Sequence, residues 1–113
     1  MIRAFIYTSK FDREWQKLGL NDDDLCHLET HLLENPTAGA IMEGTGGIRK
    51  MRWVLPHTGK SGGIRVLYID YIFSEKICMF DLFSKDEKDN LTLSEKKALK
   101  KIVKAIGEEF RNE

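Results

Sequence analysis

The sequence has few of the residues that mark secreted, fibrous or membrane proteins. It contains two cysteines and two prolines, and its apolar stretches are short and interrupted by charge. Two cysteines are too few for a disulfide scaffold, and two prolines exclude collagen and proline-rich linkers. Interrupted apolar runs cannot form a transmembrane helix, and the first residues lack an apolar run of signal-peptide length. We therefore expect a cytoplasmic protein that does not enter a membrane.

The length permits one hydrophobic core. Dividing 113 residues between two domains would leave neither with enough buried surface. Apolar residues make up 42% and charged residues 32%, which argues against a disordered chain. We expect a single domain over residues 1–113.

Acidic residues are missing from the middle of the chain. Overall the 18 acidic residues balance the 18 basic ones. Residues 12–43, however, carry eight acidic and two basic residues, whereas residues 44–69 carry five basic residues and no acidic one. Because local potential decides what a surface attracts, the segment 44–69 is a candidate for binding the phosphate backbone of a nucleic acid.

Hydrophobic periodicity predicts an α+β domain of the order β-α-α-β-β-β-α. Ser9 and Asn21 can each cap a helix, and the sequence Thr92-Leu93-Ser94-Glu95 is a capping box that opens a third. Three later strands should form an antiparallel meander, whose middle strand is central because it is apolar on both faces. We expect a mainly antiparallel sheet with the helices packed on one face. The predicted strands are 2–7, 48–55, 64–73 and 76–83.

Strand alternation brings cations together on the open face of this sheet. Lys50 and Arg52 point to one side of their strand, and Arg65, expected to face solvent, begins the neighbouring strand. Like charges at this spacing repel unless an anion lies between them, so the face resembles a phosphate site. The alternative is a solvated polar face with edge lysines that discourage aggregation. His27 and His31 have a spacing that can bind metal, but no third ligand accompanies them, so we expect no metal site.

Three segments together resemble the HigB branch of the RelE-like toxins of type II toxin–antitoxin modules. They are GTGGIRKMRW at 44–53, GKSGGIRVLYIDY at 59–71 and LFSKDEKDNLTLSEKKALKKI at 82–102. The resemblance implies a compact RelE-like fold and a ribosome-dependent mRNA endoribonuclease (mRNA interferase) that inhibits translation and arrests growth, without a cofactor. It also implies a cognate helix-turn-helix antitoxin, through which alone the toxin would meet operator DNA.

The resemblance also assigns residues. The paired basic positions of the family match Lys50 and Arg52, its phosphate-contacting arginine matches Arg65, and its basic residue after the last strand matches Lys85. In such chemistry the RNA 2′-hydroxyl attacks the adjacent phosphate, so no metal is required, and guanidinium groups stabilise the developing charge. Further candidates for contacting RNA are Arg49, His57, Lys60 and Lys88.

The general base and acid stay open at this point. The sequence has no tyrosine after Tyr71 and no histidine after His57, so the C-terminal tyrosine or histidine of some relatives has no counterpart. Lys50 could be the base if neighbouring cations favour its neutral form, and Lys85 or His57 could be the acid. The alternative function is a non-catalytic module, a decayed toxin or regulator that binds RNA or the antitoxin.

Overall fold

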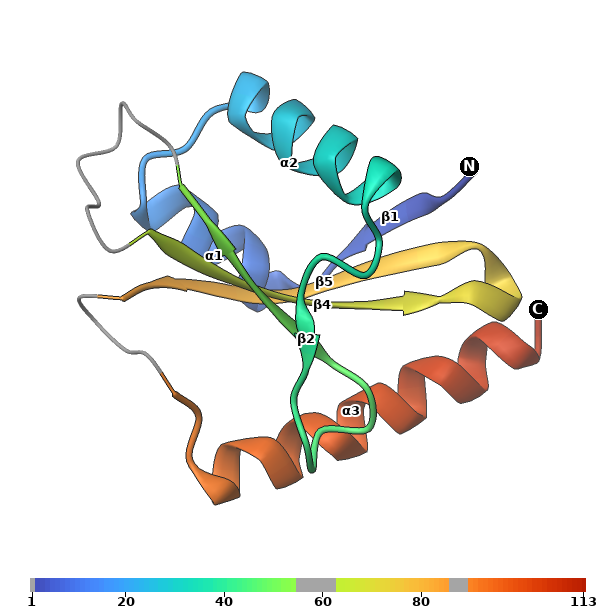
Figure 1. The fold of residues 1–113 in the computed structure, drawn as a ribbon. Helices are drawn as coiled ribbons and strands as arrows, with labels where there is room; N and C mark the ends of the chain where they lie inside the picture. Colours follow the sequence, from blue (N-terminus) through green and yellow to red (C-terminus); the bar gives the residue numbers. More distant parts are fainter. Residues whose placement is uncertain (1, 55–62, 86–89) are drawn as a thin grey trace.

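A five-stranded sheet runs through the centre of the molecule in the order β1-β5-β4-β3-β2 (Figure 1). The structure, a computed structural model, describes residues 2–54, 63–85 and 90–113. β1 is parallel to β5 and the other neighbours are antiparallel. The elements are β1 (Ala4–Tyr7), α1 (Ser9–Lys17), α2 (Asp22–Glu34), β2 (Ala40–Ile41), β3 (Arg49–Trp53), β4 (Ile64–Tyr71), the 3-10 turn η2 (Ile72–Ser74), β5 (Lys76–Ser84) and α3 (Leu93–Arg111).

Side-chain caps begin all three helices. Asn21 and Thr92 form the capping boxes with Asp24 and Glu95, respectively. The cap of α1 is Thr8 rather than the expected Ser9, and its hydroxyl accepts a hydrogen bond from the Phe11 amide at 3.1 Å. These caps accept hydrogen bonds from backbone amides that have no partner within the helix. The position of each capping side chain therefore sets the residue at which the helix begins.

The predicted meander of β3, β4 and β5 is confirmed, and β4 lies at the centre of the sheet. The α+β class and the mainly antiparallel sheet are confirmed too. A register shift at Leu67 and Tyr68 of β4 adds a residue to β5, which is a β-bulge. No helix in the described residues is long and apolar enough to cross a membrane.

The expectation that the helices cover one face is wrong. Val66 and Tyr68 of β4 pack in one core with residues of α1 and α2, whereas Leu67 and Ile69 pack in a second core with Val103 of α3. Figure 1 shows α1 and α2 on one side of the sheet and α3 on the other. The physical reason is that β4 and β5 carry apolar side chains on both faces of the sheet. Helices must therefore pack on both faces to shield these side chains from water.

Candidate functional site

Three predicted cations, Arg52, Arg65 and Lys85, lie at the end of the sheet where β3 ends, β4 begins and β5 ends, and a fourth, Lys50, lies two residues inward on β3. Arg52 of β3 lies directly opposite Arg65 of β4 in the register, and Lys50 lies two residues from Arg52 on the same face. Lys85 follows β5, and its amide donates to the carbonyl of Gly63 at 3.3 Å, two residues before Arg65. We call Lys50, Arg52, Arg65 and Lys85 the cationic cluster.

The two opposed arginines have different surroundings. Arg52 is exposed and forms no ion pair with any residue that the structure describes. Arg65 is only 9% exposed, so the expectation that it faces solvent is wrong. It lies opposite the buried Phe83 of β5, in the row of the central strand that faces the second core. Because its surroundings already restrict this guanidinium, it would lose little conformational entropy when it binds an anion.

Close backbone packing holds the cationic cluster together. A side chain at Gly63 would place its Cβ 3.2 Å from Nε of Arg52, so the arginine side chain would have to shift slightly to make room. Gly63 also has φ of +80°, which other residues rarely adopt. Lys50 Nζ donates to Oδ1 of Asn90 at 3.3 Å, just before α3. Sequence reasoning missed Asn90, because no pattern in the chain links it to a strand 40 residues earlier.

Arg49 is not brought together with the cationic cluster. It points to the opposite face of β3, where its guanidinium donates to the carbonyl of Gly39 at 2.7 Å. On the same side the hydroxyl of the buried Tyr68 accepts from the Gly39 amide at 3.0 Å and donates to the Pro36 carbonyl at 2.9 Å. Burial raises the pKa of Tyr68. Arg49 and Tyr68 thus fix the segment that precedes β3.

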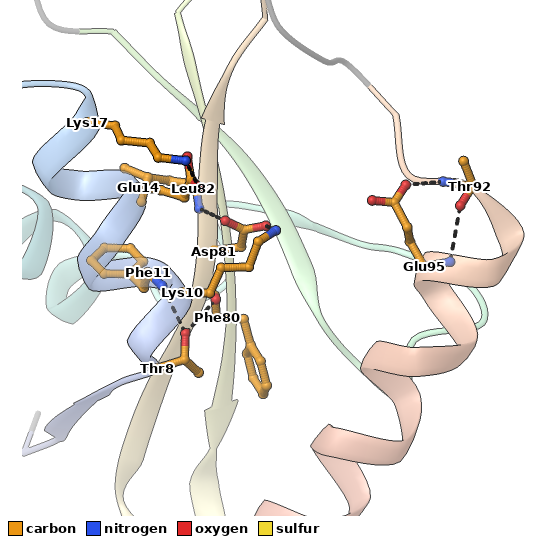
Figure 2. Close-up of polar contacts among 10 residues, drawn as sticks. All are labelled: Thr8, Lys10, Phe11, Glu14, Lys17, Phe80, Asp81, Leu82, Thr92 and Glu95. Atoms are coloured by element: carbon orange, nitrogen blue, oxygen red, sulfur yellow. Dashed lines mark hydrogen bonds and ion pairs between the residues drawn. The ribbon is translucent and has the colours of Figure 1, made fainter.

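A polar link between α1 and β5 lies two strands away from Lys50, across β4. Asp81 is opposite Leu67, which is itself opposite Lys50. Its carboxylate accepts from Lys10 Nζ at 2.6 Å and from the Leu82 amide at 2.8 Å, as Figure 2 shows. Sequence reasoning missed Lys10, although a carboxylate in the middle of an apolar strand signals that some cation must reach it.

Three candidates lie outside the described residues, namely His57, Lys60 and Lys88. His27 and His31 are exposed on α2. In the part of the chain that the structure describes, no three His, Cys, Asp or Glu side chains gather as a metal site requires.

The chain matches a known family. A family model described as the RelE toxin of the RelE / RelB toxin–antitoxin system matches residues 3–112. The chain belongs to the RelE toxin family. It is therefore the toxin of a toxin–antitoxin pair, and the predicted resemblance to RelE-like toxins is confirmed. The narrower assignment to the HigB branch stays a prediction.

Two solved structures have the same fold as this RelE-family chain. One is the Escherichia coli toxin RelE in the free state, as a mutant with two arginines replaced by alanine; it has a TM-score of 0.55 at 18% identity and covers 78% of this chain and 88% of that one. The other is the intact E. coli RelBE toxin–antitoxin complex, with a TM-score of 0.53 at 18% identity, covering 74% of this chain and 96% of that one. The second structure contains the antitoxin partner that the RelE family implies.

Proposed function

We propose that this RelE-family toxin is an endoribonuclease that cleaves messenger RNA on the translating ribosome. The single observation that carries the proposal is the direct opposition of Arg52 and Arg65, with Lys50 beside them on the same face. Like charges directly opposite each other are unfavourable in a sheet. A phosphate between the two arginines would offset this cost and accept bidentate hydrogen bonds from both guanidinium groups.

The proposed reaction uses a nucleophile that the RNA itself supplies. The 2′-hydroxyl attacks the adjacent phosphate, the bond to the 5′-oxygen breaks, and a 2′,3′-cyclic phosphate remains on the upstream fragment. Arg65 and Arg52 stabilise the negative charge that grows on the phosphate oxygens. Lys50 takes the proton of the 2′-hydroxyl, and Lys85 protonates the leaving 5′-oxygen. The mechanism as proposed requires no metal ion and no cofactor.

Dependence on the ribosome follows from what the cationic cluster lacks. Its side chains can bind phosphate, but none of them is a histidine or a carboxylate, the groups that most often act as general bases near neutral pH. Holding the 2′-hydroxyl in line with the phosphate then contributes a large share of the rate, because orientation alone can lower a barrier by several kcal/mol. The ribosome would supply this orientation by fixing the message in its decoding site.

The test is cleavage of a defined message in a purified translation system, with the cut mapped by primer extension. The wild-type toxin should cut within the translated region and leave a 2′,3′-cyclic phosphate. A single 2′-deoxynucleotide at the cut site should abolish cleavage there. Arg52→Ala should lower the single-turnover rate by roughly 10²–10³-fold, as does loss of one charge-stabilising donor elsewhere.

Arg13→Ala is the matched control, since Arg13 is an exposed arginine on α1 away from the cationic cluster. It should cleave at the wild-type rate. An intact message in the presence of folded wild-type toxin would favour the non-catalytic alternative. Wild-type rates for Arg52→Ala would remove this residue from the site.

A further inference from the structure

A groove of about 520 Å³ lies between α3 and the segment that joins β4 to β5. It is far from Arg65, because Arg65 and Tyr71 are six residues apart on β4, or about 20 Å along an extended strand. Lys50 lies nearer, since its partner Leu67 is two residues from Ile69, which lines the groove. The groove opens where β3 no longer covers β4, since their pairing ends at Arg49 and Tyr68. Gly46, before β3, forms part of its lining.

The floor of the groove is apolar. Ile69 and Tyr71 of β4 and Val103 of α3 line it, and the Tyr71 hydroxyl donates to the Val103 carbonyl at 2.9 Å. Gly107 lines it as well; a Cβ there would lie 3.4 Å from the Tyr71 ring. The Tyr71 hydroxyl thus has its hydrogen-bond partner within the protein, and a ligand in the groove would contact mainly apolar side-chain atoms.

Large apolar side chains stay exposed at the open side of the groove. Ile72 is 69% exposed and Phe73 is 53% exposed, although both belong to the same short turn, η2. Neighbouring exposed side chains of this size are typical of a surface that a protein partner covers.

The rim of the groove is basic. Lys100 and Lys104 line it from α3 and form no ion pair with any described residue, and Arg111 lies over the Phe73 ring at 4.8 Å. The one lining carboxylate, Asp70, is paired with Arg3 at 2.7 Å. The groove therefore offers apolar surface surrounded by uncompensated positive charge.

We infer that this groove binds an acidic segment of the antitoxin whose bulky apolar side chains enter it. Acidic residues would pair with Lys100, Lys104 and Arg111, and apolar residues would cover Ile72 and Phe73. RNA fits less well, because phosphates gain nothing from an apolar floor. The Phe73 ring already contacts Tyr71 edge-on at 5.9 Å and carries Arg111 over it, so a base would compete with Arg111 for that face of the ring.

This surface is separate from the proposed nuclease site. An antitoxin anchored here holds the toxin without its anchor covering Arg52 or Arg65. The inference rests on membership of the toxin family and not on the cleavage chemistry, so it stands or falls independently of the proposed function.

The test measures binding of purified toxin variants to the antitoxin encoded beside the toxin gene, by biolayer interferometry without RNA. Ile72→Asp should raise the Kd roughly 30-fold or more, because it places a charge in an apolar contact. Lys104→Glu should raise the Kd about 10-fold, mainly through slower association, and high salt should reduce this difference. Phe73→Ala is a second apolar variant that introduces no charge.

The controls are matched on the same helix and outside the groove. Lys97→Glu makes the same charge change as Lys104→Glu at an exposed position of α3, and Ile102→Asp repeats the apolar-to-acidic change at a side chain that is 45% exposed. Both should stay within about threefold of the wild-type Kd, the range expected for energetically neutral surface positions. Circular dichroism and thermal unfolding confirm that each variant is folded.

Three outcomes would overturn the inference. In the first, all groove variants bind the antitoxin like wild type. In the second, Lys97→Glu weakens binding as much as Lys104→Glu, so that general charge steering explains the effect. In the third, the groove variants keep the antitoxin affinity but no longer sediment with purified ribosomes, which would assign the groove to RNA.

Discussion

At the scale of residues, the arginines of the cationic cluster that are proposed to bind phosphate also lower the stability of the sheet. Arg52 and Arg65 occupy directly opposed positions, where like charges destabilise a sheet by a few tenths of a kcal/mol or more. The repulsion is a reason to look for an anion at this place and to expect that stability rises when it is removed.

Arg52→Ala should therefore raise the free energy of unfolding by about 0.2–1 kcal/mol while it lowers cleavage. The gain should be larger at low ionic strength than in 0.5 M salt, because salt screens the charge of the exposed Arg52. Urea unfolding at both salt concentrations measures it, with Arg13→Ala as the control that gains nothing. A loss of stability above 1 kcal/mol would contradict the argument.

Tyr68 holds the chain before β3 through one hydroxyl. Because this hydroxyl bonds the Gly39 amide and the Pro36 carbonyl in the buried core, Tyr68→Phe leaves both backbone groups without their partner. The free energy of unfolding should fall by about 1–3 kcal/mol, the cost of unsatisfied buried polar groups. Urea unfolding checks this, and a change below 0.5 kcal/mol would mean that water replaces the hydroxyl.

At the scale of elements, α3 joins both surfaces discussed above. Its N-terminal side lies next to Asn90, the partner of Lys50, and its C-terminal half lines the apolar groove. Figure 2 shows the capping box that begins it, in which the Thr92 hydroxyl accepts from the Glu95 amide and the Glu95 carboxylate accepts from the Thr92 amide.

Thr92→Ala removes this cap and should cost about 1 kcal/mol. For a domain of this size the melting temperature should fall by about 4 °C. Calorimetry measures the change, and Ser94→Ala, at an exposed position inside the first turn, is the control that should melt like wild type. Equal melting of Thr92→Ala and Ser94→Ala would mean that the capping box contributes nothing to the fold.

The elements also show what could be predicted from the sequence. The capping residues Asn21 and Thr92 were correct because a cap is decided by neighbours three residues away. The short strand β2 and the parallel pairing of β1 with β5 were not foreseen, since they depend on partners far along the chain. The alternation of side chains along a strand is a local property, so it correctly predicted that Lys50 and Arg52 share a face with Arg65. The burial of Arg65 could not be predicted in this way, because it depends on Phe83 of the neighbouring strand β5.

At the scale of the whole molecule, the sheet is buried on both faces and unfolding exposes titratable groups from both cores. Tyr68 belongs to the core under α1 and α2, and Tyr71 and Cys78 belong to the core under α3. Burial raises the pKa of both tyrosines and raises the pKa of Cys78 to about 12. All three groups therefore keep their protons in the folded state at a pH where the unfolded chain has lost them.

Stability should then fall as the pH rises above about 9, the ordinary range of a thiol. The sign follows because the unfolded state binds fewer protons than the folded state between the ordinary pKa and the raised one. Each group adds up to about 1.4 kcal/mol of lost stability per pH unit. Cys78→Ala should lower stability at every pH through the cavity it leaves, yet flatten the slope between pH 9 and pH 12.

Cys26 is exposed and Cys78 is buried, so Cys26→Ala is the matched control and should keep the wild-type slope. Urea unfolding at several pH values from 8 to 11 separates the two effects, because a cavity shifts the curve whereas a lost titration changes its steepness. If Cys78→Ala and wild type lose stability in parallel above pH 9, the thiol does not titrate on unfolding. The alkaline sensitivity would then belong to the two tyrosines, one on each face of the sheet.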